Sequence, residues 1–285
     1  MSQRCKHCMV LMNWEQMGGR VFNGLAHFIK GGIFYLYGIF TLSRWLGSFA
    51  DLGWAWNEPP ISRKVPTEEA ITSALLLIYG GANVFLEHLA AWGKAWNHSD
   101  LQHVSIAFML FGGGLLGLLF ESRRIRTFLR YSTGPYPAAT TETPKPNFNP
   151  VPALAIFLLG VLMSQHHQSS QLSTAIHGQW GALLAAGALS RLFTYVMFFL
   201  APPKSTQPSR PPTEVVTAFC MVAGGLLFMV SNRETVAYLD RLRVDAMFSL
   251  TVTAGFTALI LSWVTVVVAI KGWATKNTSM SEERF

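Results

Sequence analysis

Long apolar segments recur along this chain and restrict what it can fold into. A helix needs about 20 predominantly apolar residues to cross the hydrocarbon core of a bilayer. Seven apolar segments alternate with polar loops, at residues 23–46, 68–92, 100–122, 151–166, 172–200, 213–231 and 244–271. The sequence therefore predicts an all-α, polytopic membrane protein with seven transmembrane helices in one bundle, spanning residues 23–271.

The composition agrees with this prediction. The chain is 51% hydrophobic and 13% charged, whereas a soluble domain is about 25% charged. Its net charge of +7 comes from short basic runs between apolar segments, which does not make the basic stripe of a nucleic-acid-binding protein. We therefore expect membrane lipids with anionic headgroups as partners, and no nucleic acid. Three cysteines give no disulfide framework, and the single CKHC motif is weak evidence for zinc.

Lysine and arginine predict the orientation of the chain. They are more frequent in the first, third and fifth loops and in the C-terminal tail than on the other side. Because cytoplasmic loops carry the excess of positive charge, the tail, residues 272–285, is predicted to be cytoplasmic. The N-terminal segment, residues 1–22, is then predicted to be non-cytoplasmic.

Histidines gather at one level of the predicted bundle. At a rise of 1.5 Å per residue, seven of them fall within a layer roughly 10 Å deep near the non-cytoplasmic face. His98 lies in a loop, and the other six are candidate metal ligands: His27, His88, His103, His166, His167 and His177. Polar groups inside a membrane face the bundle interior and often mark a functional site. The sequence therefore predicts a histidine-rich pocket shared by several helices.

Several neutral imidazoles at one level suit a divalent transition metal such as zinc, copper or iron. Glu87 is a candidate general base or further ligand, and Asp100 a candidate acceptor that orients a ring. Ligands of one ion lie near 2 Å from it, so the rings of His27, His103 and His177 should lie within about 5 to 6 Å of one another. A metal-free polar pocket is the alternative.

Other histidine chemistries fit this sequence less well. Haem-based electron carriers need a site near each face, and one face here has no histidine. Membrane hydroxylases and desaturases carry HxxxH and HxxHH boxes, which the adjacent His166 and His167 do not complete. Seven-helix zinc hydrolases of ceramides place ligands in a late helix, but residues 213–271 contain no histidine.

Three stretches carry a family resemblance: GLAHFIKGGIFYLYGI, EHLAAWGKAWNHSDLQHVSIAFMLFGGGLLGLLFES and FLLGVLMSQHHQSSQLSTAIHGQW. Together they resemble the transmembrane protein 45 family, whose shared domain has no known function. The resemblance is strongest to the fungal branch of that family. The resemblance covers residues 24–200 and includes His27, Glu87, His103, His166 and His177. It implies a seven-helix membrane fold and brings no settled reaction.

Three functions fit these observations. The first is a metal-dependent membrane enzyme that acts on a lipid or another lipophilic small molecule through a metal-bound water. The second is a carrier for a metal ion or a proton, and the third is a non-catalytic scaffold or trafficking factor. A carrier needs polar groups that continue into the cytoplasmic half. The sequence offers only Ser43, Arg191 and Glu121 there, all near the edge of the membrane, which favours an enzyme or a fixed binding site.

Overall fold

The computed structural model describes residues 3–56, 65–86, 95–96, 98–132, 148–166, 168, 170–202 and 208–282. These residues form helices and no strand, so the all-α prediction is confirmed. The helices are α1 (Gln3–Trp45), α2 (Glu68–Leu86), α3 (His98–Glu121), α4 (Arg123–Ser132), α5 (Val151–Ser164), α6 (Gln171–Leu200), α7 (Pro212–Val230), α8 (Arg233–Arg241) and α9 (Ala246–Glu282), with a 3-10 turn η1 (Ala50–Leu52).

Six of the seven predicted spans are long and apolar enough to cross a membrane within the described residues: Gly24–Trp45, Glu68–Leu86, Asp100–Glu121, Gln171–Leu200, Pro212–Val230 and Ala246–Lys276. Helix α5, the remaining predicted span, has 14 residues and is roughly 21 Å long at 1.5 Å per residue. It begins beside Pro150 and Pro152 and ends where the polar sequence SQHHQSSQ starts. The count of seven spans is therefore not confirmed.

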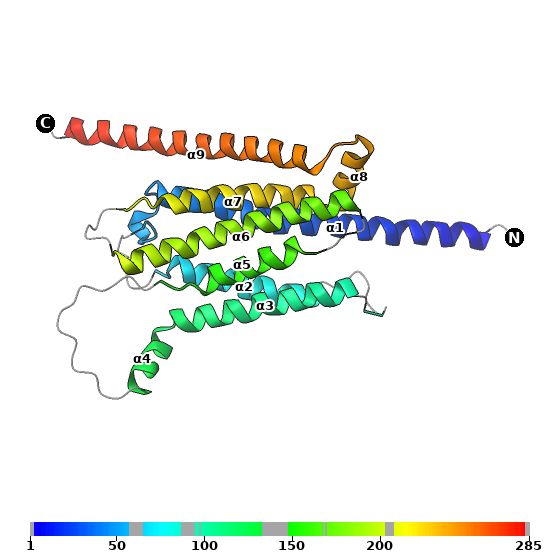
Figure 1. Ribbon diagram of the computed structural model, residues 1–285, viewed down its shortest axis with the longest axis horizontal. Coiled ribbons are helices and arrows are strands. Elements are labelled where there is room, and N and C mark those ends of the chain that lie inside the picture. The colour runs from blue at the N-terminus through cyan, green and yellow to red at the C-terminus, as the bar shows by residue number, and fades with distance from the viewer. Residues whose placement is uncertain are drawn as a thin grey trace.

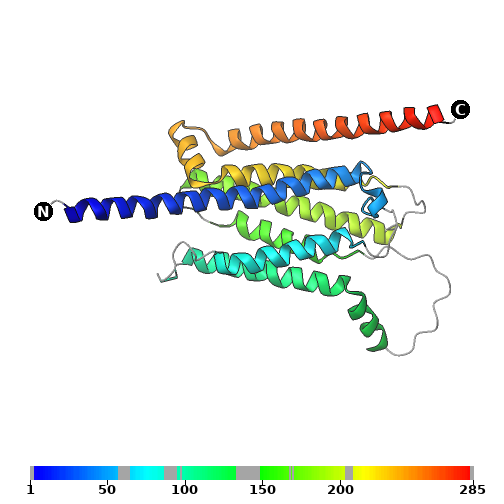
Figure 2. The same cartoon turned by 180° about the vertical axis from the view of Figure 1, so that it is seen from behind.

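The helices pack in a layered bundle around α6 and α7 (Figure 1). Helix α7 contacts α1 and α6, α6 also contacts α5, and α5 joins the α2–α3 pair to the rest. Seen from behind, α1 runs alongside α7, while α2 and α3 lie together at the opposite edge (Figure 2). Helix α9 lies along the outside of the bundle with most of its side chains exposed. The two termini lie at opposite ends of the bundle.

The middle of the bundle is apolar and closely packed. Trp180 and Leu184 of α6 are fully buried, as are Met221 and Leu227 of α7. The Trp180 ring stacks on Phe228 with a centroid separation of 4.1 Å and an interplanar angle of 4°. This core separates the two ends of the bundle, where polar side chains gather.

Glycines bring α2 and α3 into backbone contact. A Cβ atom at Gly114 of α3 would meet backbone atoms of Ser73 and Leu77 in α2. A Cβ atom at Gly112, two residues earlier, would meet no atom within 4 Å. Small residues at a helix interface permit such close approach in membranes, so the two glycines of this GGG sequence have different roles.

We therefore expect Gly114→Ala to destabilise the protein and Gly112→Ala to leave its stability almost unchanged. Overpacking of a closely packed interface costs about 1–3 kcal/mol, which should appear as a lower thermal unfolding midpoint in detergent. Equal midpoints for the two variants would show that α2 and α3 do not approach each other as closely as the structure indicates.

Candidate functional site

His177 lies on the buried face of α6, near the N-terminal end of the helix, and is 5% exposed. Its Nδ1 atom lies 2.8 Å from the carbonyl oxygen of Ser173, one turn earlier. A carbonyl oxygen only accepts a hydrogen bond, so Nδ1 carries the proton and donates it, which leaves the Nε2 lone pair available to a ligand. Metal-binding histidines are commonly oriented in this way by a backbone carbonyl.

Four of the predicted histidines form what we call the histidine cluster: His27, His103, His166 and His177. The rings of His27 and His177 lie edge to face with centroids 6.2 Å apart. The centroids of His103 and His166 lie 5.4 Å apart. His177 interacts electrostatically with the other three rings, so the two pairs share one region of the bundle. The residues come from α1, α3, α6 and the turn that follows α5.

Imidazoles that bind one zinc ion at about 2.0–2.1 Å have ring centres roughly 5 to 6 Å apart. The His103–His166 pair lies within this range at 5.4 Å, whereas the His27–His177 pair, at 6.2 Å, lies just beyond it. Within the part of the chain that the structure describes, however, no three His, Cys, Asp or Glu side chains are arranged to hold a metal ion. The structure thus brings the four rings together as two pairs, and not as a preformed set of three or four ligands.

The other predicted site residues are distributed differently. Glu87 and His88 lie outside the described residues, and so does His167. His98 is exposed at the start of α3, while Asp100 lies in the first turn of the same helix and is partly buried. Trp180 and Phe228 underlie the cluster, with ring centroids 5.6 Å from His177 and His27, respectively. The cluster therefore has an apolar floor.

A second polar site occupies the opposite end of the bundle. Five charged residues are buried there, and we call them the charge network: Arg44, Glu68, Glu69, Arg191 and Glu214. Their side chains are at most 9% exposed. They come from α1, α2, α6 and α7, so the network joins four helices.

Arg191 is the centre of the charge network. Its Nε and NH2 atoms donate to the two carboxylate oxygens of Glu214 at 3.1 and 2.7 Å. Its NH1 atom donates to Oε1 of Glu68 at 3.2 Å and to the Tyr37 hydroxyl at 2.8 Å. A planar guanidinium suits this two-sided, bidentate arrangement, which a lysine does not reproduce.

Arg44 extends the network towards the loop that follows α1. Its NH1 atom donates to Oε2 of Glu68 at 3.2 Å, and its Nε atom donates to the carbonyl oxygen of Trp54. The guanidinium lies 4.2 Å from the centre of the Trp56 ring, a cation–π contact. Trp56 is 2% exposed, so this loop turns back and covers the network.

Sequence reasoning placed Arg191 near the membrane edge and found few polar groups in that half of the bundle. The structure contradicts this, because Arg191 lies more than two turns before α6 ends at Leu200 and has buried carboxylate partners. An ionisable residue within an apolar helix is itself a signal of a buried partner. Glu68 and Glu214 gave no such signal, since acidic residues are ordinary in the first turn of a helix.

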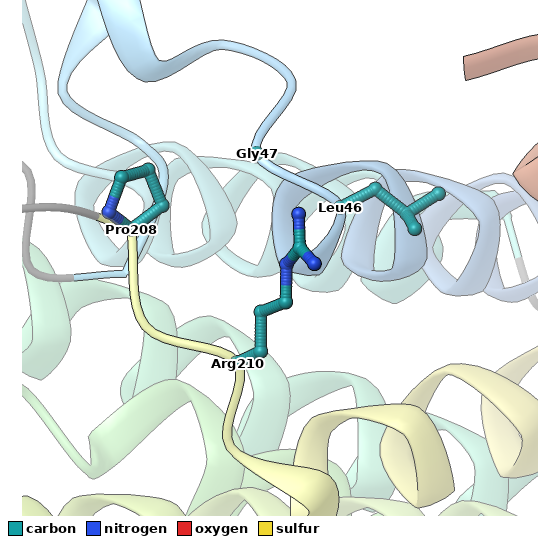
Figure 3. A pocket seen from close by; sticks show the side chains of 4 residues that line it. All are labelled: Leu46, Gly47, Pro208 and Arg210. Carbon is teal, nitrogen blue, oxygen red and sulfur yellow. The ribbon is translucent and has the colours of Figure 1, made fainter. Parts of the chain in front are cut away.

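An open pocket of about 490 Å³ lies at the same end, lined by Leu46, Gly47, Pro208 and Arg210 (Figure 3). The Arg210 guanidinium lies 5.8 Å from the centre of the Trp45 ring. The pocket has no histidine or carboxylate among these residues, and it lies at the end of the bundle opposite the histidine cluster. It therefore belongs to neither polar site.

Comparisons with known proteins identify relatives of the chain. The family described as "Protein YTP1-like, C-terminal" matches residues 3–272. An uncharacterized membrane protein of Schizosaccharomyces pombe is 40% identical over 283 residues, covering 94% of this chain and 55% of the relative. One of Saccharomyces cerevisiae is 40% identical over 282 residues, with 93% and 45% covered. Protein YTP1 of the same yeast is 27% identical over 244 residues, with 84% and 45% covered.

The chain spans about half the length of the curated relatives it matches. No solved structure matches it. Two of these relatives are membrane proteins by name, in agreement with the apolar helices of the structure.

Proposed function

This chain belongs to the YTP1-like, C-terminal family, which has membrane proteins of fungi among its members, and we propose that it binds a transition-metal ion in the histidine cluster. One observation carries the proposal: two imidazole pairs, with 6.2 and 5.4 Å between ring centres, lie in one region of the bundle. Zinc, copper and iron all accept imidazole ligands.

For all four rings to bind one ion, the His27–His177 pair and the His103–His166 pair must move closer together. His166 lies in the turn after α5 rather than within a helix. We also propose Glu87, His88 and His167 as further ligands. Glu87 is alternatively a general base. The resemblance to the transmembrane protein 45 family also stays a proposal.

We also propose on which side of the membrane the histidine cluster lies. More lysines and arginines flank the end of the bundle that carries the charge network, and the termini lie at opposite ends. By the positive-inside rule, the histidine cluster then lies near the non-cytoplasmic face and the C-terminus lies in the cytoplasm.

As an enzyme, the site would act on a lipid or another lipophilic small molecule that enters from the membrane. A bound metal would supply a hydroxide at neutral pH by lowering the pKa of its water, and would polarise an ester or amide carbonyl. The protein would contribute the histidine ligands, which lie beside the apolar rings of Trp180 and Phe228.

A carrier for a metal ion or a proton is the second candidate, and the charge network favours it. Polar groups that continue into the second half of the bundle distinguish a carrier from an enzyme with one fixed site. The buried ion pairs of Arg44 and Arg191 with Glu68 supply such groups. In proteoliposomes, a carrier moves the metal across the bilayer, whereas an enzyme only binds it and turns over lipid.

Metal analysis of the detergent-purified protein tests the proposal. After resupply with zinc, copper or iron, we expect close to one equivalent of one metal by inductively coupled plasma mass spectrometry. His177→Gln and His103→Gln should each weaken binding by at least about tenfold, because even outer-shell partners of a metal contribute 10–100-fold to affinity.

His98→Gln is the matched control, since His98 is exposed on the same helix as His103. It should leave the metal content unchanged. A folded wild-type protein that stays metal-free after resupply would contradict the metal site and leave the metal-free polar pocket. Equal loss in the His98 variant would point to adventitious surface binding.

A further inference from the structure

The charge network does not balance. Among the described residues it holds two guanidinium groups, Arg44 and Arg191, and three carboxyl groups, Glu68, Glu69 and Glu214. With every group ionised, the site would carry one negative charge in excess. A net charge buried within a membrane bundle is strongly unfavourable, and a carboxyl group escapes that cost by holding a proton.

The partners of each carboxyl group identify the one in excess. Glu214 accepts two hydrogen bonds from Arg191 and one from the Thr194 hydroxyl at 2.9 Å. Glu68 accepts hydrogen bonds from both arginines. Its Oε1 atom also accepts hydrogen bonds from the hydroxyl groups of Tyr37 and Thr72, at 2.9 and 3.0 Å. Both groups are held as carboxylates by charged donors.

Glu69 has weaker partners. Among the described residues, its Oε1 atom accepts a hydrogen bond from the Tyr195 hydroxyl at 3.3 Å, and its own backbone amide also acts on the carboxyl group. Its ion-pair distance to Arg44 is 4.0 Å, the longest in the network, and Arg44 is already bound to Glu68 at 3.2 Å. Glu69 is therefore the carboxyl group whose charge the network compensates least.

Among the described residues, the other charged groups near Glu69 do not compensate its charge either. Glu68 precedes it on α2, and Glu121 of α3 also acts on it electrostatically, as a like charge. Glu121 accepts from the Thr67 hydroxyl through Oε2 at 2.8 Å, while its Oε1 atom is buried with no hydrogen-bond partner among the described residues. Arg126 of α4 donates to the Glu121 carbonyl oxygen at 3.0 Å. Two acidic neighbours thus face Glu69 against one arginine that is already paired.

We propose that Glu69 is a proton-binding site, which holds a proton at neutral pH and makes the charge network neutral as a whole. The Oε1 atom of Glu69 accepts the hydrogen bond from the Tyr195 hydroxyl, and its Oε2 atom holds the proton. The site is separate from the histidine cluster, because the apolar core around Trp180 lies between them, and it does not depend on metal binding. In a carrier, Glu69 is the group that exchanges a proton at this end of the bundle.

Infrared spectroscopy of the protein in lipid nanodiscs tests the assignment. At neutral pH, the wild type should show a carboxylic-acid carbonyl band that shifts on exchange into heavy water. Glu69→Gln should abolish the band. Glu121→Gln is the matched control, at the same end of the bundle, and should retain it. Absence of the band in the wild type, or its persistence in the Glu69 variant, would overturn the proposal.

Stability provides a second readout. Glutamine has the shape and neutrality of a protonated glutamate, so Glu69→Gln should unfold at the wild-type temperature, while Glu68→Gln and Glu214→Gln should unfold lower because they remove partners of Arg191. A Glu69→Gln protein that fails to fold would contradict a neutral Glu69. If the wild type were more stable in sodium or potassium than in choline, and Glu69→Gln were equally stable in all three, Glu69 would bind a metal cation and not a proton.

Discussion

Arg191→Met is expected to lower the free energy of unfolding by about 3–5 kcal/mol, since removal of one partner from a buried ion pair leaves an uncompensated charge. The substitution removes the donors to Glu214 and Glu68 at 2.7 to 3.2 Å. It keeps a long apolar stem of similar length, so packing changes little. The loss should appear as a large fall in the thermal unfolding midpoint in detergent and as poor yield.

A double variant separates charge from shape. Arg191→Met combined with Glu214→Gln should recover part of the loss, because the fully buried Glu214 carboxylate then carries no charge. Arg210→Met is the control: Arg210 is exposed and contacts the Trp45 ring, and exposed charges contribute little to stability. If Arg191→Met and Arg210→Met unfold at the same temperature, the network does not stabilise the bundle.

The apolar segments were sufficient to predict the helical bundle, because a membrane-spanning helix needs only length and hydrophobicity. They also predicted the fourth span, residues 151–166, as the shortest of the seven. The predicted span at 151–166 ended at His166, whereas α5 ends at Ser164 and the next residues form a turn. Proline at the start and a polar run at the end leave little room for an apolar helix.

The helix rise was sufficient to predict that the histidines lie at a similar depth in the bundle, but not which rings form pairs. A rise of 1.5 Å per residue gives the depth of a side chain, whereas the direction it faces depends on how the helices are rotated in the bundle. His27 with His177 and His103 with His166 are therefore findings of the structure. Their sequence signal is the shared depth alone.

The charge network shows where sequence reasoning fails more deeply. Glu68 and Glu214 occupy first turns of helices, where an acidic residue is favoured by the helix dipole and needs no buried partner. Only Arg191, within the apolar sequence LSRLFTYVMFFL, was detectable as unusual. Its partners lie 23 and 123 positions away in the sequence, so tertiary packing decides the pairing.

Trp56→Ala should destabilise the protein by about 3–5 kcal/mol, the usual cost of removing a large buried aromatic side chain. Trp56 is 2% exposed, its ring lies over Arg44, and it packs against Tyr195 and Phe198 with centroids 6.1 and 5.5 Å away. Its backbone carbonyl also accepts from the amide of Ser209 at 2.8 Å. Trp56 therefore closes the end of the bundle over the charge network, and its loss admits water to buried ion pairs.

Two further variants distinguish this covering role from simple bulk. Trp56→Phe keeps an aromatic face for Arg44, so it should lose much less stability than Trp56→Ala, because a cation–π contact depends on the ring and not on the indole N–H. That N–H has no hydrogen-bond partner among the described residues, so its removal costs little. Trp263→Ala, on the exposed side of α9 at 69% exposure, should leave the unfolding midpoint unchanged. If Trp56→Ala behaved like Trp263→Ala, the loop would be a peripheral segment, and the ion pairs beneath it would already be open to water.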